Sequence, residues 1–308
     1  DSGILKIMRK SILVMLACLI FLNAGYIIAE LMIPLPTGTK TSEIYIPQGA
    51  TFRDTIDILS AENLVRDKNP FLFVGRLSGI HRKIRAGYYS LTGEMSPLDI
   101  LRLLKSGQII EYELTVVEGD SIFEIGEKLA EKNIVSSERF IELAKDENFL
   151  EAHNINAPSV EGYIFPDTYN IPKGIEPENA VGMMINTMRD KYSDEFRQRA
   201  DRIGFTENQV LTLASIIEKE ARVDSEREMI SAVYHNRLKK RMPLQADPTA
   251  IYGIKRSKDG VTSNDLKRKT DYNTYIIKGL PPGPIASPGI KSIRAALYPA
   301  DVPYKYFV

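Results

Sequence analysis

The chain has 308 residues, 44% of them hydrophobic, and 40 basic residues balance 40 acidic residues to a formal net charge of zero. This length suits one large domain or two to three small ones. The neutral balance argues against a nucleic-acid partner, which would require a basic face. A single cysteine, Cys18, excludes an intrachain disulfide and argues against a thiolate metal site or a cysteine nucleophile. The three histidines show no metal-ligand spacing, so neither a metal nor a cofactor is expected.

Near the N-terminus, residues 12–33 form an almost uninterrupted apolar run, which is long enough to cross a bilayer as one helix. Lys6, Arg9 and Lys10 precede the run, and the positive-inside bias therefore predicts a cytoplasmic tail over residues 1–11. A cleaved signal peptide is the alternative, but the run is long for one and lacks a clear cleavage site. The sequence predicts a single-pass anchor, with everything after it outside the cytoplasm.

A short linker over residues 34–43 leads to an α+β region, residues 44–155, that contains an internal repeat. Ile46–Asp54 matches Val116–Glu124 at a constant offset of 70 residues. Each copy is predicted to be a strand, a glycine turn, a Ser or Thr helix cap with an acid three residues later, and a helix. This pattern resembles the LysM module, a small binder of N-acetylglucosamine polymers. The alternative is that both copies are simple α/β spacers.

The composition changes in residues 156–308, where Pro/Gly loops are rich in Asn, Thr and Tyr. Such loops are poor core material but suit the lining of a polar cleft. Amides, hydroxyls and carboxylates can bind sugar hydroxyls, and aromatic rings can stack on sugar rings. The candidate sugar-binding residues are Glu161, Tyr163, Asn236, Gln245, Asp247, Thr249, Tyr272, Asn273, Thr274 and Tyr275.

The candidate catalytic residue is Glu218, in a predicted amphipathic helix over Val210–Arg222. At about 100° per residue, Glu218 falls inside the apolar arc of this helix. Apolar surroundings disfavour the charged form and raise the pKa of a carboxyl group, which is what a general acid near neutral pH needs. The alternative is an ordinary ion pair with Arg222 at i+4.

A standard glycosidase needs two carboxylates, and the sequence does not identify which residue would be the partner of Glu218. Glu220 is two residues away on the same helix and points about 160° from Glu218. Glu161, Asp167 and Asp247 are the other candidates, although each aspartate reads equally well as a turn former.

Five ordered motifs resemble the YceG-like family of endolytic murein transglycosylases. They are Glu161-Gly-Tyr-Ile-Phe-Pro-Asp-Thr-Tyr, Ala214-Ser-Ile-Ile-Glu-Lys-Glu, Asn236-Arg-Leu, Leu244-Gln-Ala-Asp-Pro-Thr, and Tyr272-Asn-Thr-Tyr with the following Gly279-Leu-Pro-Pro-Gly-Pro-Ile. The resemblance implies that Glu218 is catalytic and that residues 156–308 are a YceG-like catalytic domain. Two departures stand out. Ala246 replaces a serine that is common in the family, and relatives usually continue for some tens of residues beyond Val308.

The resemblance also implies a reaction that needs only one carboxylate. The family cuts the β-1,4 bond between N-acetylmuramic acid and N-acetylglucosamine in nascent glycan strands, leaves a 1,6-anhydro end, and so limits strand length. The expected location is a bacterial inner membrane with a periplasmic catalytic domain. The implied partners are peptidoglycan strands and penicillin-binding synthases.

The sequence thus predicts an α+β protein: an anchor, a LysM-like region and a mixed α+β catalytic domain. Two other functions stay open. One is a hydrolytic muramidase that uses Glu218 with Asp247 or Glu161, and the other is a non-catalytic, membrane-tethered glycan-binding scaffold.

Overall fold

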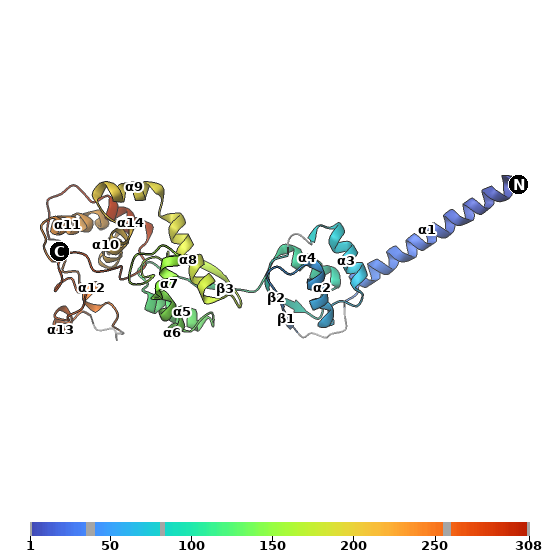
Figure 1. Cartoon of the computed structure of the whole chain (residues 1–308), viewed down its shortest axis with the longest axis horizontal. Helices are drawn as coiled ribbons and strands as arrows, with labels where there is room; N and C mark the ends of the chain where they lie inside the picture. Colours follow the sequence, from blue (N-terminus) through green and yellow to red (C-terminus); the bar gives the residue numbers. More distant parts are fainter. Residues whose placement is uncertain (1, 35–40, 81–83, 255–259, 307–308) are drawn as a thin grey trace. The chain divides into compact units, whose positions relative to one another are not determined.

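The computed structural model describes residues 2–34, 41–80, 84–254 and 260–306. Most of the predicted linker, residues 35–40, therefore lies outside the described residues. The chain divides into two compact units (Figure 1), the first comprising Asp1–Glu111 with Pro172–Gly174 and the second comprising Tyr112–Ile171 with Ile175–Val308. The fold is mixed α+β, as predicted, and it is mostly helical.

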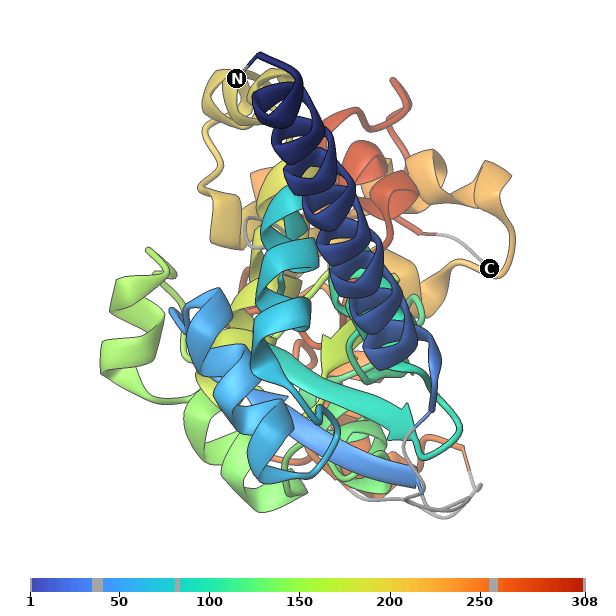
Figure 2. The same ribbon diagram turned by 90° about the vertical axis from the view of Figure 1, so that its right-hand side faces the viewer.

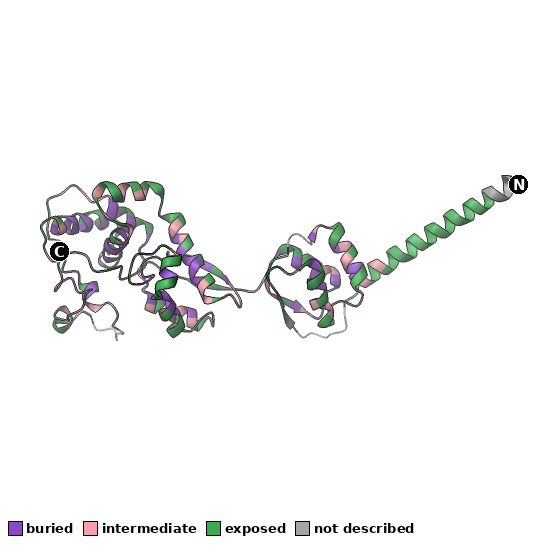
Figure 3. Ribbon diagram, viewed as in Figure 1, coloured by how far each residue is buried: buried purple, intermediate pink, exposed green. Residues whose placement is uncertain are grey.

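The predicted anchor is a single helix, α1 (Ser2–Met32), which begins earlier than expected because residues 2–11 continue it. Its stretch Ile7–Met32 is long and apolar enough to cross a membrane, a test that a signal sequence also passes. Most of this stretch is exposed (Figure 3), but Leu31 near its end is buried in the core of the first unit and Ile27 packs against that core. The helix is thus confirmed, whereas its orientation stays a prediction.

The rest of the first unit is a two-stranded sheet with helices. Its elements are β1 (Thr41–Ile46), α2 (Phe52–Ala61), α3 (Lys68–Leu77), β2 (Gly87–Thr92) and α4 (Pro97–Ser106). The strands are antiparallel, with registers from Thr41 opposite Thr92 to Ile46 opposite Gly87, and Figure 2 shows them side by side. Alternate strand residues point inward, so that Ile44 and Ile46 join Leu59 of α2 in one core.

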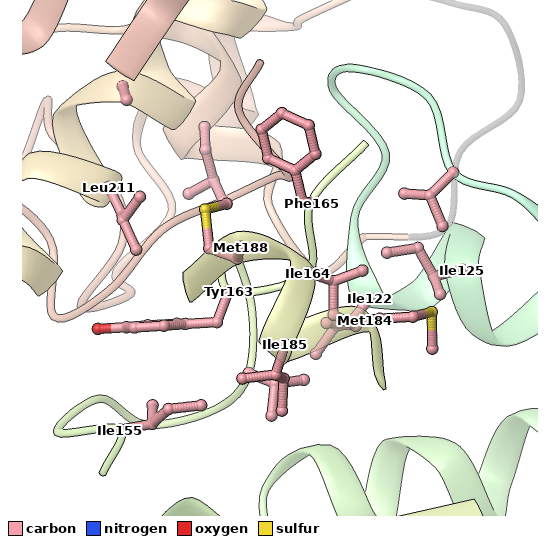
Figure 4. Packing of buried hydrophobic residues seen from close by; sticks show 14 of the residues in the cluster. Ile122, Ile125, Ile155, Tyr163, Ile164, Phe165, Met184, Ile185, Met188 and Leu211 are labelled. Atoms are coloured by element: carbon pink, nitrogen blue, oxygen red, sulfur yellow. The ribbon is translucent and has the colours of Figure 1, made fainter. Parts of the chain in front are cut away.

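The second unit is built mainly of helices around a larger core. Its elements are β3 (Glu111–Thr115, whose first residue is grouped with the first unit), α5 (Ile122–Glu131), α6 (Ser137–Ala144), α7 (Glu147–Ala152), β4 (Thr168–Pro172, whose last residue is likewise grouped), α8 (Pro177–Lys191), α9 (Asp194–Ile203), α10 (Glu207–Glu220), α11 (Arg227–Lys239), α12 (Asp247–Ile251), α13 (Ser263–Leu266) and α14 (Ile290–Leu297). Strands β3 and β4 pair with each other. Met184, Ile185 and Met188 of α8 pack in the core beside Tyr163 and Ile164 (Figure 4).

The internal repeat is present in the structure. Helices α2 and α5 each begin with a capping box, Thr51 with Asp54 and Ser121 with Glu124, and each has ten residues. Soon after the helices, Asn63 and Asn133 adopt a left-handed conformation with φ of 58° and 54°. Both copies run strand, helices, strand, so the predicted local pattern is confirmed. The likeness to a LysM module stays a prediction.

The structural boundary between the units differs from the predicted boundary at residues 155 and 156. The second copy of the repeat belongs to the second unit because its apolar face is part of that unit's core. Leu129 of α5 and Phe140 of α6 are fully buried in the same cluster as Val210 of α10. Local pattern does not reveal this packing, since both copies have the same amphipathic helices.

Candidate active site

Glu218 lies in the last turn of α10, and its carboxylate is held by two donors. Arg227 Nη1 donates to Oε1 at 2.8 Å, and the backbone N–H of Gly289 donates to Oε2 at 2.8 Å. The side chain is only 5% exposed. A cation and an N–H donor compensate the burial of the carboxylate, which would otherwise be costly.

These contacts correct two expectations about Glu218. Its carboxylate does not end among apolar side chains, because it pairs with Arg227 and with the backbone N–H of Gly289, the residue before α14. The ion-pair partner is Arg227 from the start of α11, whereas Arg222, the expected alternative, is exposed.

The helices that carry Glu218 and precede or follow its partners pack in the core of the second unit. Helix α10 is capped by Thr206 with Gln209 and buries eight consecutive residues, Val210 to Ile217. One of them, Ser215, accepts the backbone N–H of Ile285 through its Oγ at 3.0 Å. Helix α14 buries Ile293, which helps to fix Gly289 opposite Glu218.

A chain of charges extends from Glu218 over the start of α14. Arg227 also donates through Nε to Asp224 at 3.2 Å and through Nη1 to the hydroxyl of Ser292. Asp224 in turn pairs with Lys291. The hydrogen bonds of Lys291 and then of Arg227 hold the pKa of Asp224 below its ordinary value. Arg227 is therefore a cation shared by two carboxylates.

Glu161 is buried, with 1% of its surface exposed, and lies away from these contacts. It accepts the N–H of Ile122 at the start of α5 and the hydroxyl of Tyr252, the latter at 2.8 Å. Burial raises its pKa to about 8 and outweighs both donors, which lower it. Glu161 connects the second repeat copy to the loop after α12. It has no exposed surface for a sugar.

Glu220 at the end of α10 and Asp247 at the start of α12 lie close enough for their charges to interact. The hydroxyl of Tyr275 donates to Oδ1 of Asp247 at 2.5 Å. Burial raises the pKa of Glu220 and the charge of Asp247 raises it further, whereas the hydrogen bond of Tyr234 opposes the shift. Asp247 and Tyr275 are the predicted sugar-binding residues that still present a polar surface beside α10.

Four predicted sugar-binding residues instead hold loops together. Asn236 Nδ2 donates to the carbonyls of Val302 and Tyr304. The amide of Asn273 donates to three carbonyls, and the hydroxyls of Thr249 and Thr274 lie 2.8 Å apart beneath the surface. With Asn273, Thr249 and Thr274 fully buried, these side chains shape the loops that line the site and do not face it.

Among the other predicted residues, Tyr163 is also a core residue, 2% exposed, with its ring beneath Arg189. Asp167 does not form the expected turn, because Thr168 begins strand β4, and its Oδ1 accepts the N–H of Thr168 at 2.8 Å. By contrast, Gln245 is exposed, and the half-buried ring of Tyr272 packs at a tilt of 37° against Tyr252, with centroids 4.6 Å apart. Gln245 and Tyr272 therefore remain candidates for ligand contact.

A cavity of about 520 Å³ lies beside Lys219, the neighbour of Glu218. Residues from α5, α12 and the following loop line it, and they include Ser121, Phe123, Glu124, Pro248, Ile251 and Tyr252. The second repeat copy thus forms one wall of a hollow next to the candidate catalytic helix.

Sequence reasoning missed Arg227 and Gly289. Each lies at the start of a helix, and neither is spaced from Glu218 in a way that helical periodicity detects. The only local signal was the Ser-Pro-Gly289 turn before α14, which is typical of a tight helix entry.

Comparison with known proteins shows the family to which the chain belongs. The chain is 32% identical to the endolytic murein transglycosylase of Bacillus subtilis over 91% of this chain and 82% of that protein. It is 26% identical to the enzyme of the same name from Streptococcus pneumoniae, of which it spans 56%. A crystal structure of a YceG-like protein from Listeria monocytogenes superposes with a TM-score of 0.59 at 29% identity, covering 87% of this chain and 93% of that one. The family model for YceG-like proteins matches residues 44–308, and the chain belongs to the YceG-like family.

Proposed function

We propose that this protein is a membrane-anchored endolytic lytic transglycosylase that cuts peptidoglycan strands with Glu218 as its single acid/base. The observation that carries the proposal is the Glu218 carboxylate in the last turn of α10, which Arg227 and the backbone N–H of Gly289 hold in place. The relatives named as endolytic murein transglycosylases support the choice of substrate.

The reaction breaks the bond between C1 of N-acetylmuramic acid and O4 of N-acetylglucosamine. Protonated Glu218 gives its proton to O4 as the C1–O4 bond breaks. The resulting carboxylate then accepts the proton of the C6 hydroxyl while O6 bonds to C1. The products are a 1,6-anhydro end and a free O4 hydroxyl, and Glu218 regains its proton. No water and no protein nucleophile is consumed.

The contacts of Glu218 suit the second half of this cycle. Once Glu218 has given up its proton, Arg227 and the Gly289 N–H stabilise the carboxylate and keep its oxygens in a fixed plane. A fixed base is needed because the C6 hydroxyl must be aligned with C1 when it attacks.

The wider assignment follows from the anchor and the repeat. Helix α1 would hold the enzyme at the bacterial inner membrane with both units outside the cytoplasm, where new glycan strands are made. Cleavage there would end strand elongation, in association with penicillin-binding synthases. The strand–helix–strand repeat would bind glycan as a LysM-like region.

The test compares purified full-length protein with its Glu218→Gln variant on isolated glycan strands, with chain ends identified by mass spectrometry. We expect anhydro ends from the wild type and a loss of about 10²- to 10⁴-fold in rate for the variant. The fold should survive, because Arg227 keeps Asp224 and Ser292 as partners.

The matched control is Glu226→Gln, an exposed acid next to Arg227 that should retain full activity. A Glu218→Gln protein that is folded and fully active would rule out Glu218 as the acid/base, whereas a folded wild type that cuts no strands would favour the scaffold function. Reducing ends from the wild type would favour a hydrolytic muramidase.

A further inference from the structure

Glu118 lies in the turn between β3 and α5, and this turn is fastened to the segment before α14. The N–H of Gly119 donates to the carbonyl of Ser287 at 2.9 Å, and the N–H of Ser287 donates to the carbonyl of Asp120 at 2.7 Å. Lys219 Nζ also donates to the carbonyl of Gly119, at 3.1 Å. The neighbour of Glu218 therefore holds the same turn that carries Glu118.

The Glu118 carboxylate packs directly against Gly289. A Cβ atom at position 289 would lie 1.9 Å from Oε1 of Glu118. Gly289 has φ of −73°, which any residue can adopt, so the close approach of Glu118 accounts for the glycine better than backbone conformation does.

Two carboxylates therefore converge on Gly289, because its N–H donates to Glu218. Standard bond lengths place the nearest oxygens of Glu118 and Glu218 at most about 8 Å apart. Carboxylate pairs that flank a scissile glycosidic bond lie within about 5–9.5 Å of each other.

Unlike Glu161, Glu118 is exposed and can meet a ligand. It lines a surface hollow of about 510 Å³ together with Val117 and Asp167. Lys291 lies nearby, and its pKa is raised first by Asp224 and further by the charge of Glu118. Glu118 thus has room for a sugar beside it and belongs to the charged chain of the site.

The repeat supplies an internal comparison. The position equivalent to Glu118 in the first copy, 70 residues earlier, is Gln48. The turn itself therefore tolerates a neutral amide of the same shape, and the carboxylate is specific to the copy that borders Glu218.

We propose, on the basis of the proposed function, that Glu118 is a second carboxylate of the active site that faces the same sugar as Glu218. Its negative charge stabilises the positive charge that develops on C1 and the ring oxygen as the glycosidic bond breaks. It forms no bond to the sugar and exchanges no proton, so the products are unchanged.

The first test is Glu118→Gln in the full-length protein, with steady-state kinetics on glycan strands and mass spectrometry of the chain ends. We expect kcat to fall about 10- to 100-fold while KM changes by less than about threefold and the ends stay 1,6-anhydro. The matched control is Glu113→Gln, an exposed acid on β3 that should keep wild-type kinetics.

A kcat for Glu118→Gln within twofold of the wild type would overturn the role of Glu118 alone, provided that the wild type makes anhydro ends. Reducing ends from the wild type would overturn the lyase assignment on which the inference rests. The two failures are therefore distinguishable.

A second test uses the contact with Gly289. Gly289→Ala keeps the N–H that Glu218 accepts but displaces Glu118, so it should lower kcat by a similar factor. In a Glu118→Ala background the collision is gone, and the same glycine substitution should lower kcat by a smaller factor than it does in the wild type. If the losses in kcat from Glu118→Ala and Gly289→Ala were fully additive, Gly289→Ala would not act through its contact with Glu118.

Discussion

Glu218 and Arg227 depend on each other, since both side chains are almost completely removed from solvent. Their exposed fractions are 5% and 10%. Removing Arg227 leaves the buried Glu218 carboxylate without a cation, which costs far more than the pair itself contributes. The site therefore carries a stability signature that can be measured without substrate.

Arg227→Met should lower the free energy of unfolding by about 3 kcal/mol, because the Glu218 carboxylate keeps only the Gly289 N–H. Urea unfolding measures the change. Arg222→Met removes an exposed arginine and should stay within about 0.5 kcal/mol of the wild type. The reverse order would mean that Arg222 is the true partner of Glu218.

Because Glu161 is buried, we expect the free energy of unfolding to depend on pH. Burial raises its pKa from 4.5 to about 8 in the folded protein, so the native state holds the proton more tightly than the unfolded state. The resulting stability is full below pH 4.5 and is lost as the pH rises toward 8 and above.

The Glu161→Gln variant cannot ionise at this position and removes this dependence. The difference in unfolding free energy, wild type minus variant, should therefore fall between pH 5 and pH 8, by at most about 1.4 kcal/mol per pH unit. Urea titrations across this range measure it. A difference that is flat or rises with pH would show that Glu161 is ionised in the native protein.

At the scale of elements, the second repeat copy links the core to the site. Helix α5 contributes Leu129 to the core of the second unit, and the turn before α5 reaches the segment that precedes α14. The same local pattern in the first copy serves a different core. The position of a repeated element thus follows from its packing partners, which its own sequence does not specify.

Loss of the N-cap hydroxyl should lower the free energy of unfolding by the same amount in both copies of the repeat. Ser121→Ala and Thr51→Ala each remove the side-chain acceptor of a capping box and should destabilise their own unit by about 1 kcal/mol. Hydrogen exchange of the amides in α5 and α2 reports each unit separately. An effect confined to one copy would show that the capping boxes are not equivalent.

What the sequence could predict is what short-range chemistry specifies. Apolar length predicted α1, and a hydroxyl followed by an acid predicted the starts of α2 and α5. Local sequence pattern could not predict the surroundings of Glu218, because Arg227 and Gly289 come from other elements. Composition alone could not tell a loop-holding amide such as Asn273 from one that faces a ligand.

At the scale of the whole molecule, the sequence before α1 predicts the side of the membrane on which the two units lie. We expect both units outside the cytoplasm, because three basic residues precede the apolar run. In a Cys18→Ala background, Thr41→Cys in intact spheroplasts should react with a membrane-impermeant thiol reagent, and Ser2→Cys should react only after lysis. The opposite labelling would show that the anchor has the inverse orientation, which would place both units in the cytoplasm, away from the proposed substrate.

The central claim is that the sugar's own C6 hydroxyl, with Glu218 as the only acid/base, replaces water at C1. The most direct measurement is digestion of purified glycan strands by the full-length protein in water enriched in oxygen-18, with mass spectrometry of the new ends and Glu218→Gln alongside. The account predicts 1,6-anhydro ends without heavy oxygen from the wild type and almost no new ends from the variant. Reducing ends that carry oxygen-18, or undiminished cleavage by a folded Glu218→Gln protein, would contradict it.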